Sequence, residues 1–137
     1  MHTLPLQLRF NDIDMMGHVN NAVIMEFFDL GKARYFEEAG LPVRPDEGDF
    51  CVMVVHLEVD FHAQIHWDDP LAVTSHVSNW GNKSLRVKQQ VINANTGQPY
   101  ASCQTVMAGY SRSTAASAVI PDEVKQRVQR YDECIAS

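Results

Sequence analysis

The segment from Ala22 to Ala39 constrains the fold most, because it predicts a long helix that is apolar around most of its circumference. Apolar residues form two adjacent lines at helical spacing, namely Val23, Phe27 and Leu30 and, beside them, Ile24, Phe28, Gly31 and Tyr35. Asn20 or Asn21 is suited to cap the start of this helix, and Gly40 is suited to end it. A helix of this kind needs other elements around it, so we expect the rest of the chain to enclose it.

The remaining chain is dominated by segments with strand character. Residues 55–67 alternate strictly between apolar and polar side chains, which indicates a strand with one polar face. The predicted strands cover residues 3–11, 55–67, 71–78, 84–92 and 100–111. Residues 41–50 are expected to form a loop, residues 95–98 a hairpin turn, and Pro121 opens a short C-terminal helix. One long helix against a mainly antiparallel sheet is an α+β architecture, and a dimer formed by edge pairing would protect the sheet edges.

Length and composition predict one globular domain over residues 1–137. The content of 45% hydrophobic and 20% charged residues is ordinary for a soluble protein. No apolar run approaches the roughly 20 residues that span a bilayer, and no signal peptide is visible, so a cytoplasmic location is expected. The formal net charge of −6 argues against non-specific binding to nucleic acids. Cys51, Cys103 and Cys134 have no CxxC or Cys/His zinc spacing and are expected to be reduced and structural.

Residues 12–21, which directly precede the predicted helix, combine two carboxylates, a glycine, a histidine and two amides. A carboxylate beside a helix N-terminus brings a base together with a group that stabilises developing negative charge. This pairing suits the hydrolysis of an acyl carbonyl. Asp12, at the end of the first predicted strand, is expected to be structural.

The motif Asp-x-Asp-x-x-Gly-His-Val-Asn-Asn, placed between a strand and a long helix with four further strands, gives the chain a family likeness over nearly its whole length. The chain resembles the hotdog fold, and in particular the acyl-CoA thioesterases of the 4-hydroxybenzoyl-CoA thioesterase-like family. Weaker matches are the sequence at 69–71 before a strand, and Gly81 with Ser84 at the following turn.

This resemblance implies an antiparallel five-stranded sheet wrapped around a long central helix. It also implies a homodimer or homotetramer with active sites at the subunit interfaces. No metal or other cofactor is implied, since coenzyme A is part of the substrate. The family often places a tyrosine near the acyl pocket, three residues after the position of Asn21, and here that residue is Ile24. The difference disfavours a specific aryl-CoA substrate.

The resemblance assigns the catalytic carboxylate to Asp14, which either attacks the thioester directly or acts as a general base on water. Without the resemblance, Asp14 is better explained as a turn residue that bonds nearby backbone amides. Asn21 matches a position where relatives carry a polar side chain near the catalytic water, and His18 orients the loop or contacts the substrate. Gly17 supplies a backbone shape that other residues disfavour, and the N–H groups around Asn20 and Asn21 are expected to polarise the thioester carbonyl.

Binding of coenzyme A by an acidic protein requires a local group of basic residues for the phosphates. Lys83 and Arg86, with Ser84 between them, are the expected contacts on the strand that follows Gly81. A solvent-facing sheet surface explains each of them equally well.

The histidines and carboxylates at positions 56–66 also suggest a metal site. Along one strand, however, His62 and His66 lie about 13 Å apart, given the rise of 3.2–3.4 Å per residue, which is too far for one ion. We therefore expect no metal, and a solvated or subunit-facing sheet surface instead.

Three alternatives share the fold. An acyl-carrier-protein thioesterase has the same chemistry, but its acidic partner is disfavoured by the net charge of −6. A dehydratase needs a paired histidine and carboxylate, which His18 and Asp14 only imitate. A non-catalytic acyl-CoA-binding module is disfavoured by the intact Asp14.

Overall fold

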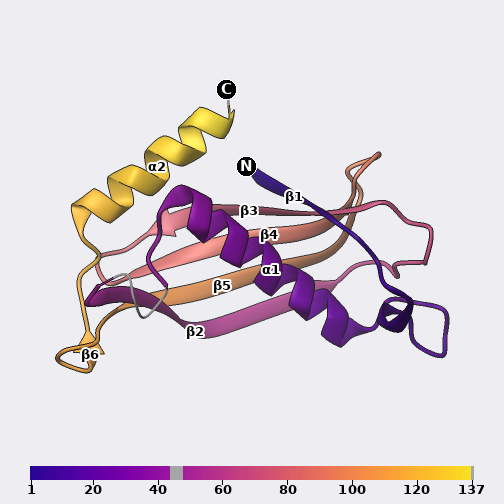
Figure 1. Cartoon of the computed structure of the whole chain (residues 1–137), viewed down its shortest axis with the longest axis horizontal. Helices are drawn as coiled ribbons and strands as arrows, with labels where there is room; N and C mark the ends of the chain where they lie inside the picture. Colours follow the sequence, from indigo (N-terminus) through magenta and orange to yellow (C-terminus); the bar gives the residue numbers. More distant parts are fainter. Residues whose placement is uncertain (44–47, 137) are drawn as a thin grey trace.

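The structure is a computed structural model that describes residues 1–43 and 48–136. Within these residues it contains one antiparallel sheet with two α-helices, and α1 lies across one face of the sheet (Figure 1). The helices are α1 (Asn21–Ala39), α2 (Asp122–Ala136) and a single 3₁₀ turn, η1 (Phe10–Asp12). The strands are β1 (His2–Leu6), β2 (Phe50–Phe61), β3 (Leu71–Trp80), β4 (Ser84–Asn93), β5 (Pro99–Ser111) and β6 (Ala116–Ser117). The strand order is β1-β3-β4-β5-β2, with β6 paired to β5. The predicted α+β class is confirmed.

The ends of α1 are fixed by the residues that the sequence indicated. The Asn20 side chain accepts a hydrogen bond from the N–H of Ala22 at 2.8 Å and so caps the helix. Gly40 adopts the left-handed conformation, with φ 83°, and its N–H donates to the carbonyl of Phe36. The predicted helix therefore agrees with α1 to within one residue.

The middle of α1 approaches the sheet closely at Gly31. A Cβ at this position would lie 2.6 Å from a methyl carbon of Val73 on β3, so a larger residue does not fit without a shift. Beside it, the buried amide of Gln89 on β4 donates to the carbonyl of Phe28 at 2.9 Å and to the hydroxyl of Ser75 at 3.0 Å. Steric fit and a buried hydrogen bond thus hold the same part of the helix against β3 and β4.

Several predicted element boundaries are wrong. The strand predicted over 3–11 ends at Leu6, because the chain then turns into η1. The strand predicted over 55–67 is β2, which starts at Phe50 and ends at Phe61, with a bulge after Val54. Beyond β2 the chain leaves the sheet, although the alternating pattern continues. Within the described residues the sheet has six strands, not the predicted five, because β6 pairs with the end of β5. Part of the predicted loop, residues 44–47, lies outside the described residues.

Reciprocal hydrogen bonds join α2 to α1. The buried Tyr35 hydroxyl on α1 donates to the carboxylate of Asp132 on α2 at 2.8 Å and accepts from the N–H of Val77 at 3.1 Å. In return, the Tyr131 hydroxyl on α2 donates to Glu38 at 2.9 Å. Burial, together with this hydrogen bond, raises the pKa of Tyr131 to about 12, and burial also raises the pKa of Asp132. Both pKa shifts arise because these side chains are partly removed from solvent where α2 packs against α1.

One edge of the sheet is formed by β2, which exposes an unusual amount of apolar surface. Its exposed apolar side chains are Met53, Val54, Val55, Leu57 and Phe61. An exposed apolar edge strand is a surface on which another chain pairs readily. Among the described residues, no helix is long and apolar enough to cross a membrane.

We predict that Gly31→Ala destabilises the protein, although alanine favours helix formation by about 1 kcal/mol. The added methyl group overlaps with the fully buried Val73, and overpacking of this kind typically costs about 1–3 kcal/mol. Urea unfolding measures the effect. Combining the change with Val73→Ala should cost less than the sum of the two single changes, and strict additivity would contradict a direct clash.

Candidate functional site

Residues 13–19 form a tight hairpin at one end of the sheet. Ile13 pairs with Val19 in an antiparallel bridge, and the N–H of Asp14 donates to the carbonyl of His18 at 2.8 Å. The turn closes through the N–H of Gly17, which donates to the carbonyl of Asp14 at 3.1 Å. Gly17 has φ 81°, a conformation that side chains disfavour, so the expected role of this glycine is confirmed.

The carboxylate of Asp14 is oriented by the backbone of its own loop. One oxygen, Oδ1, accepts from the N–H of Met16 at 2.9 Å and from the N–H of His18 at 3.2 Å. Among the described residues, the other oxygen, Oδ2, accepts no hydrogen bond. The side chain is solvent-exposed and lines a pocket, so it is both fixed in direction and available for chemistry.

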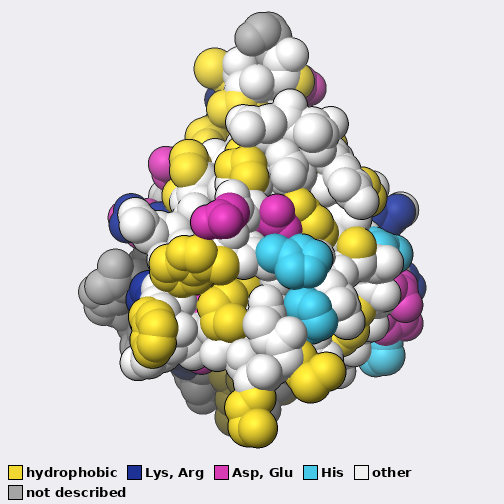
Figure 2. Space-filling view, turned by 90° about the vertical axis from the view of Figure 1, so that its right-hand side faces the viewer, with side chains coloured by type: hydrophobic (Ala, Val, Ile, Leu, Met, Phe, Trp, Pro, Cys, Tyr) yellow, Lys and Arg dark blue, Asp and Glu magenta, His cyan; other side chains and the backbone are white. Residues whose placement is uncertain are grey.

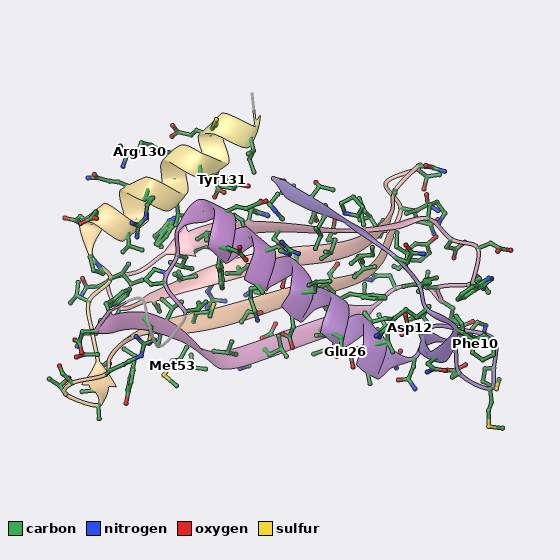
Figure 3. The ribbon with its side chains drawn as sticks, in the orientation of Figure 1. Phe10, Asp12, Glu26, Met53, Arg130 and Tyr131 are labelled. Atoms are coloured by element: carbon green, nitrogen blue, oxygen red, sulfur yellow. The ribbon has the colours of Figure 1, made fainter. Side chains whose placement is uncertain are left out.

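Asp12 anchors the loop to the rest of the chain. Its carboxylate is only 1% exposed and accepts from the N–H of Arg9 at 2.8 Å and from the Arg9 guanidinium at 3.0 Å. Its carbonyl accepts from the N–H of Asn20 at 2.9 Å, so the same residue also fixes the start of α1 (Figure 3). The predicted structural role of Asp12 is confirmed, although the residue lies in η1 and not in a strand.

The first turn of α1 presents one unused backbone donor to this region. The Asn20 carbonyl accepts from the N–H groups of Val23 and Ile24, and its side chain accepts from that of Ala22. Among the described residues, the N–H of Asn21 donates to no acceptor. Of the two N–H groups expected to polarise a carbonyl, that of Asn20 is therefore occupied by Asp12, and that of Asn21 is available. The partial positive charge of the helix N-terminus makes the N–H of Asn21 a stronger hydrogen-bond donor to a developing negative charge.

A pocket of about 560 Å³ lies between the hairpin, the start of α1 and the chain that follows β2. Its lining residues are Asp14, Met16, His18, Val19, Asn20, Asn21, Ile24 and residues 61–65. Val19, Ile24 and Ile65 are buried and form an apolar floor. Figure 2 views the molecule from this end and shows hydrophobic, acidic and histidine side chains together on one face. The structure thus brings together five of the predicted site residues.

The part of the pocket wall formed by residues 62–65 is missing from the sequence prediction, whereas Phe61 is one of the residues that the sequence suggests for the acyl pocket. The N–H groups of His62 and Ala63 both donate to the carbonyl of Tyr100, which ends the pairing with β5. The carbonyl of Ile65 then accepts from the N–H of Val19 at 2.9 Å. No spacing in the sequence indicates this contact, because it joins segments that are more than forty residues apart.

The histidines beyond β2 are also placed differently from the prediction. His62 and His66 do not share a strand face, since β2 ends at Phe61. The His62 ring bonds to the hydroxyl of Ser102 at 2.8 Å, whereas the His66 ring lies edge-on to His18 with centroids 5.2 Å apart. No cluster of three or more potential metal ligands occurs in residues 1–43 and 48–136.

The predicted phosphate contacts lie at the opposite end of the sheet. Ser84 pairs with Ala108 on β5, whereas the pocket lies beside Tyr100, eight residues further back along the same strand. At about 3.3 Å per residue, this separation is roughly 26 Å. Within one chain, therefore, Lys83, Ser84 and Arg86 do not join the Asp14 pocket.

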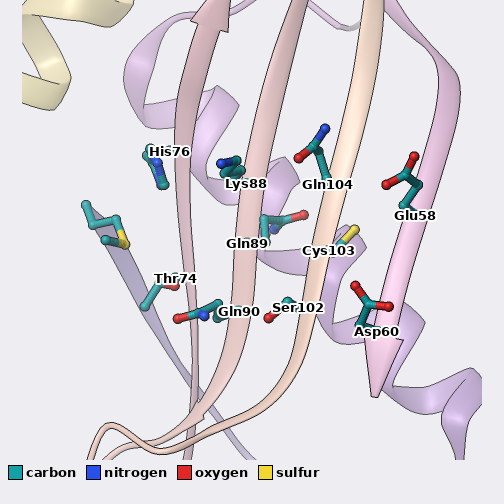
Figure 4. Close-up of a pocket in the computed structure, with 11 residues that line it drawn as sticks. Glu58, Asp60, Thr74, His76, Lys88, Gln89, Gln90, Ser102, Cys103 and Gln104 are labelled. Carbon is teal, nitrogen blue, oxygen red and sulfur yellow. The ribbon is translucent and has the colours of Figure 1, made fainter. Parts of the chain in front are cut away.

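A second pocket, of about 440 Å³, lies on the sheet face opposite α1 (Figure 4). Its lining residues include Glu58 and Asp60 of β2, His76 of β3 and Lys88 of β4. None of the predicted site residues lines it. It therefore contains neither Asp14 nor the N-terminus of α1, which characterise the first pocket.

Comparison with known proteins identifies a family and a fold for the chain. The model of the thioesterase-like superfamily matches residues 8–128. A thioesterase from Thermus thermophilus, solved with coenzyme A and Zn, is 29% identical, with a TM-score of 0.76 over 93% of this chain and 91% of its own. A 1,4-dihydroxy-2-naphthoyl-CoA thioesterase from Synechocystis is 20% identical, with a TM-score of 0.81 over 95% of this chain and 96% of its own. A search of curated protein sequences gave no significant match. The structural likeness shows that the chain has the hotdog fold.

We predict that Asn20→Ala destabilises the protein by about 1 kcal/mol, because the N–H of Ala22 loses its capping acceptor. Asn20→Asp is the matched control, since a carboxylate oxygen replaces the amide oxygen and favours the helix N-terminus. Urea unfolding of the three proteins provides the measurement. Equal stability of the alanine variant and the original chain would show that the cap contributes nothing.

Proposed function

This chain belongs to the thioesterase-like superfamily and is a thioester hydrolase, and from this premise we propose that its substrates are acyl-CoA thioesters. The products are a free carboxylic acid and coenzyme A. The observation that carries the proposal is one pocket lined by the oriented Asp14 carboxylate and by Asn21, whose backbone N–H is unused. The Thermus thermophilus relative and a Staphylococcus aureus protein of the same fold were both solved with coenzyme A.

In the proposed mechanism, the thioester carbonyl oxygen accepts a hydrogen bond from the N–H of Asn21. Negative charge develops on this oxygen when the carbonyl carbon is attacked, and one such donor contributes roughly 3 kcal/mol to transition-state stabilisation. The helix N-terminus adds to the effect. The hydrogen bond is strongest in the transition state, which is the requirement for an increase in rate.

Asp14 acts through Oδ2, the oxygen that the loop leaves unbonded. In one route, Oδ2 attacks the carbonyl carbon and forms a mixed anhydride, the thiolate of coenzyme A leaves, and water hydrolyses the anhydride. In the other route, Oδ2 takes a proton from a water molecule that attacks the carbonyl carbon, and the thiolate leaves in the same way. A thiolate is a good leaving group, so neither route needs a strong general acid. Neither needs a metal or another cofactor.

The remaining pocket residues have supporting roles in this proposal. Gly17 shapes the turn that holds Asp14, and Asn20 fixes the helix start through its cap. The side chain of Asn21 contacts the attacking water, and His18 contacts the substrate or orients the loop. Ile24, on the apolar floor, contacts the acyl group.

We also propose a homodimer formed by antiparallel pairing of two β2 edges, as a basis for the dimeric or tetrameric assembly expected from the family. The exposed apolar side chains of β2 support this pairing, since a dimer covers them. A two-fold axis places the Phe61 end of one β2 beside the Phe50 end of the other. Because Met53 pairs with Ala108, and Ala108 with Ser84, the second chain then brings its Lys83–Arg86 segment toward the first chain's pocket. Each of the two sites in the dimer then combines the Asp14 pocket of one chain with the Lys83–Arg86 segment of the other, although the two lie roughly 26 Å apart within one chain. In the proposed hotdog arrangement, the sheet wraps around α1 in each subunit.

We predict that the purified protein releases coenzyme A from acyl-CoAs and that Asp14→Asn reduces the rate by roughly 10²–10⁴-fold, because the amide neither attacks nor takes a proton. A thiol-release assay with acetyl- to palmitoyl-CoA, benzoyl-CoA and hydroxybenzoyl-CoA measures both statements. Binding of acyl-CoA and the unfolding midpoint should change little. Full activity of the variant would reject Asp14 as the catalytic carboxylate. Turnover of acyl carrier protein substrates alone would reassign the substrate.

We predict that Leu57→Lys converts the dimer into monomers with much lower thioesterase activity, because it places a charge in the proposed apolar interface. Sedimentation velocity measures the oligomeric state. A complementation experiment tests the shared site: Asp14→Asn and a Lys83→Ala, Arg86→Ala double variant are each assayed alone and after refolding together. Mixed dimers contain one site with both intact halves, so activity should be partly restored. No restoration in verified mixed dimers would contradict the shared site.

A further inference from the structure

The hairpin that carries Asp14 exposes two consecutive methionines. Met15 is fully exposed and Met16 is three-quarters exposed. They differ in position, because Met16 lines the Asp14 pocket and Met15 does not. The N–H of Met16 is also one of the two donors that orient the Asp14 carboxylate. An accessible thioether side chain therefore belongs to the wall of the pocket that holds the proposed catalytic group.

We propose that Met16 is a site of reversible oxidation by hydrogen peroxide, and that this modification weakens acyl-substrate binding in the Asp14 pocket. In the reaction, the thioether sulfur attacks one peroxide oxygen, the O–O bond breaks, a sulfur–oxygen bond forms, and water is released. The sulfur loses two electrons and the peroxide gains them, so the balance needs no further reactant. Methionine sulfoxide reductases reverse the modification.

The effect follows from the position of Met16 on the pocket wall. Sulfoxide formation replaces a flexible apolar group with a polar one that carries a strong acceptor oxygen. The floor of the same pocket is apolar and is formed by Val19, Ile24 and Ile65. An acyl group that packs against Met16 then displaces water from the sulfoxide oxygen without replacing its hydrogen bonds, so we expect KM for acyl-CoA to rise by about tenfold.

The other oxidisable side chains serve as internal references. Met53 is about half exposed on β2 and does not line the Asp14 pocket, whereas Met107 is buried. Burial raises the pKa of the Cys103 thiol, which reduces its reactivity. Cysteine disulfides and sulfenic acids are in addition restored by dithiothreitol, whereas a methionine sulfoxide is not.

The experiment treats the full chain with hydrogen peroxide, maps oxidised peptides by mass spectrometry, and measures kcat and KM before and after treatment. Met16→Leu and Met15→Leu form the matched pair, and each is compared with its own untreated sample. We expect oxidation of Met16 and a rise in KM for the original chain and for Met15→Leu. Met16→Leu should keep its own KM. Methionine sulfoxide reductase should restore the lost activity, and dithiothreitol should not.

Two results would overturn the inference: an unmodified Met16 when Met53 is oxidised, or an equal rise in KM in both leucine variants. The activity readout rests on the proposed function, so the same samples are also tested for binding of a non-hydrolysable acyl-CoA thioether. If the untreated protein hydrolyses no acyl-CoA, the proposed function fails. Loss of thioether binding that depends on Met16 would then still support the oxidation site, and unchanged or absent binding would reject it.

Discussion

The close approach of α1 to β3 and β4 at Gly31 is the contact on which the rest of the structure depends. No side chain separates the helix backbone from Val73 at this point, and the Gln89 amide binds the helix carbonyl next to it. The distance between α1 and the sheet is therefore fixed, as well as the direction of the helix. Asn21 lies ten residues before Gly31, or about 15 Å along a straight helix, so its N–H is fixed relative to the sheet as well. The position of the Asn21 N–H, the proposed carbonyl-binding group, thus depends on the packing of Gly31 against Val73.

The site itself is built with backbone hydrogen bonds. Asp14 is oriented by two N–H groups of its own turn, and the turn is attached to α1 through the carbonyl of Asp12 and to the chain after β2 through the carbonyl of Ile65. Backbone donors need no side-chain ordering and keep their geometry while the substrate reacts. This explains how a single carboxylate and one helix N-terminus suffice for the proposed chemistry, given a thiolate as the leaving group.

The edge strand β2 connects the site with the proposed assembly. Its end at Phe61 forms part of the pocket wall, and its exposed apolar side chains extend toward Met53, at the opposite end of the molecule from Asp12 (Figure 3). The expected phosphate-binding residues lie at that opposite end. In our proposal, the antiparallel pairing of two β2 strands therefore buries their exposed apolar side chains. The same pairing also brings basic residues to the Asp14 pocket.

The sequence by itself determined the elements whose signals are local. The bounds of α1 follow from Asn20 and Gly40, and the buried face of β4 follows from its alternating residues, because capping and periodicity act over a few positions. The turn around Gly17 was predictable for the same reason. Only the tertiary structure decided where β2 ends, that residues 62–65 line the pocket, and that Asn21 and not Asn20 has the unused N–H. Each of these depends on a hydrogen bond to a backbone group of another segment, such as Ile65 with Val19 or Asp12 with Asn20. Every residue has the same backbone groups, so the side-chain pattern does not reveal which distant ones will pair.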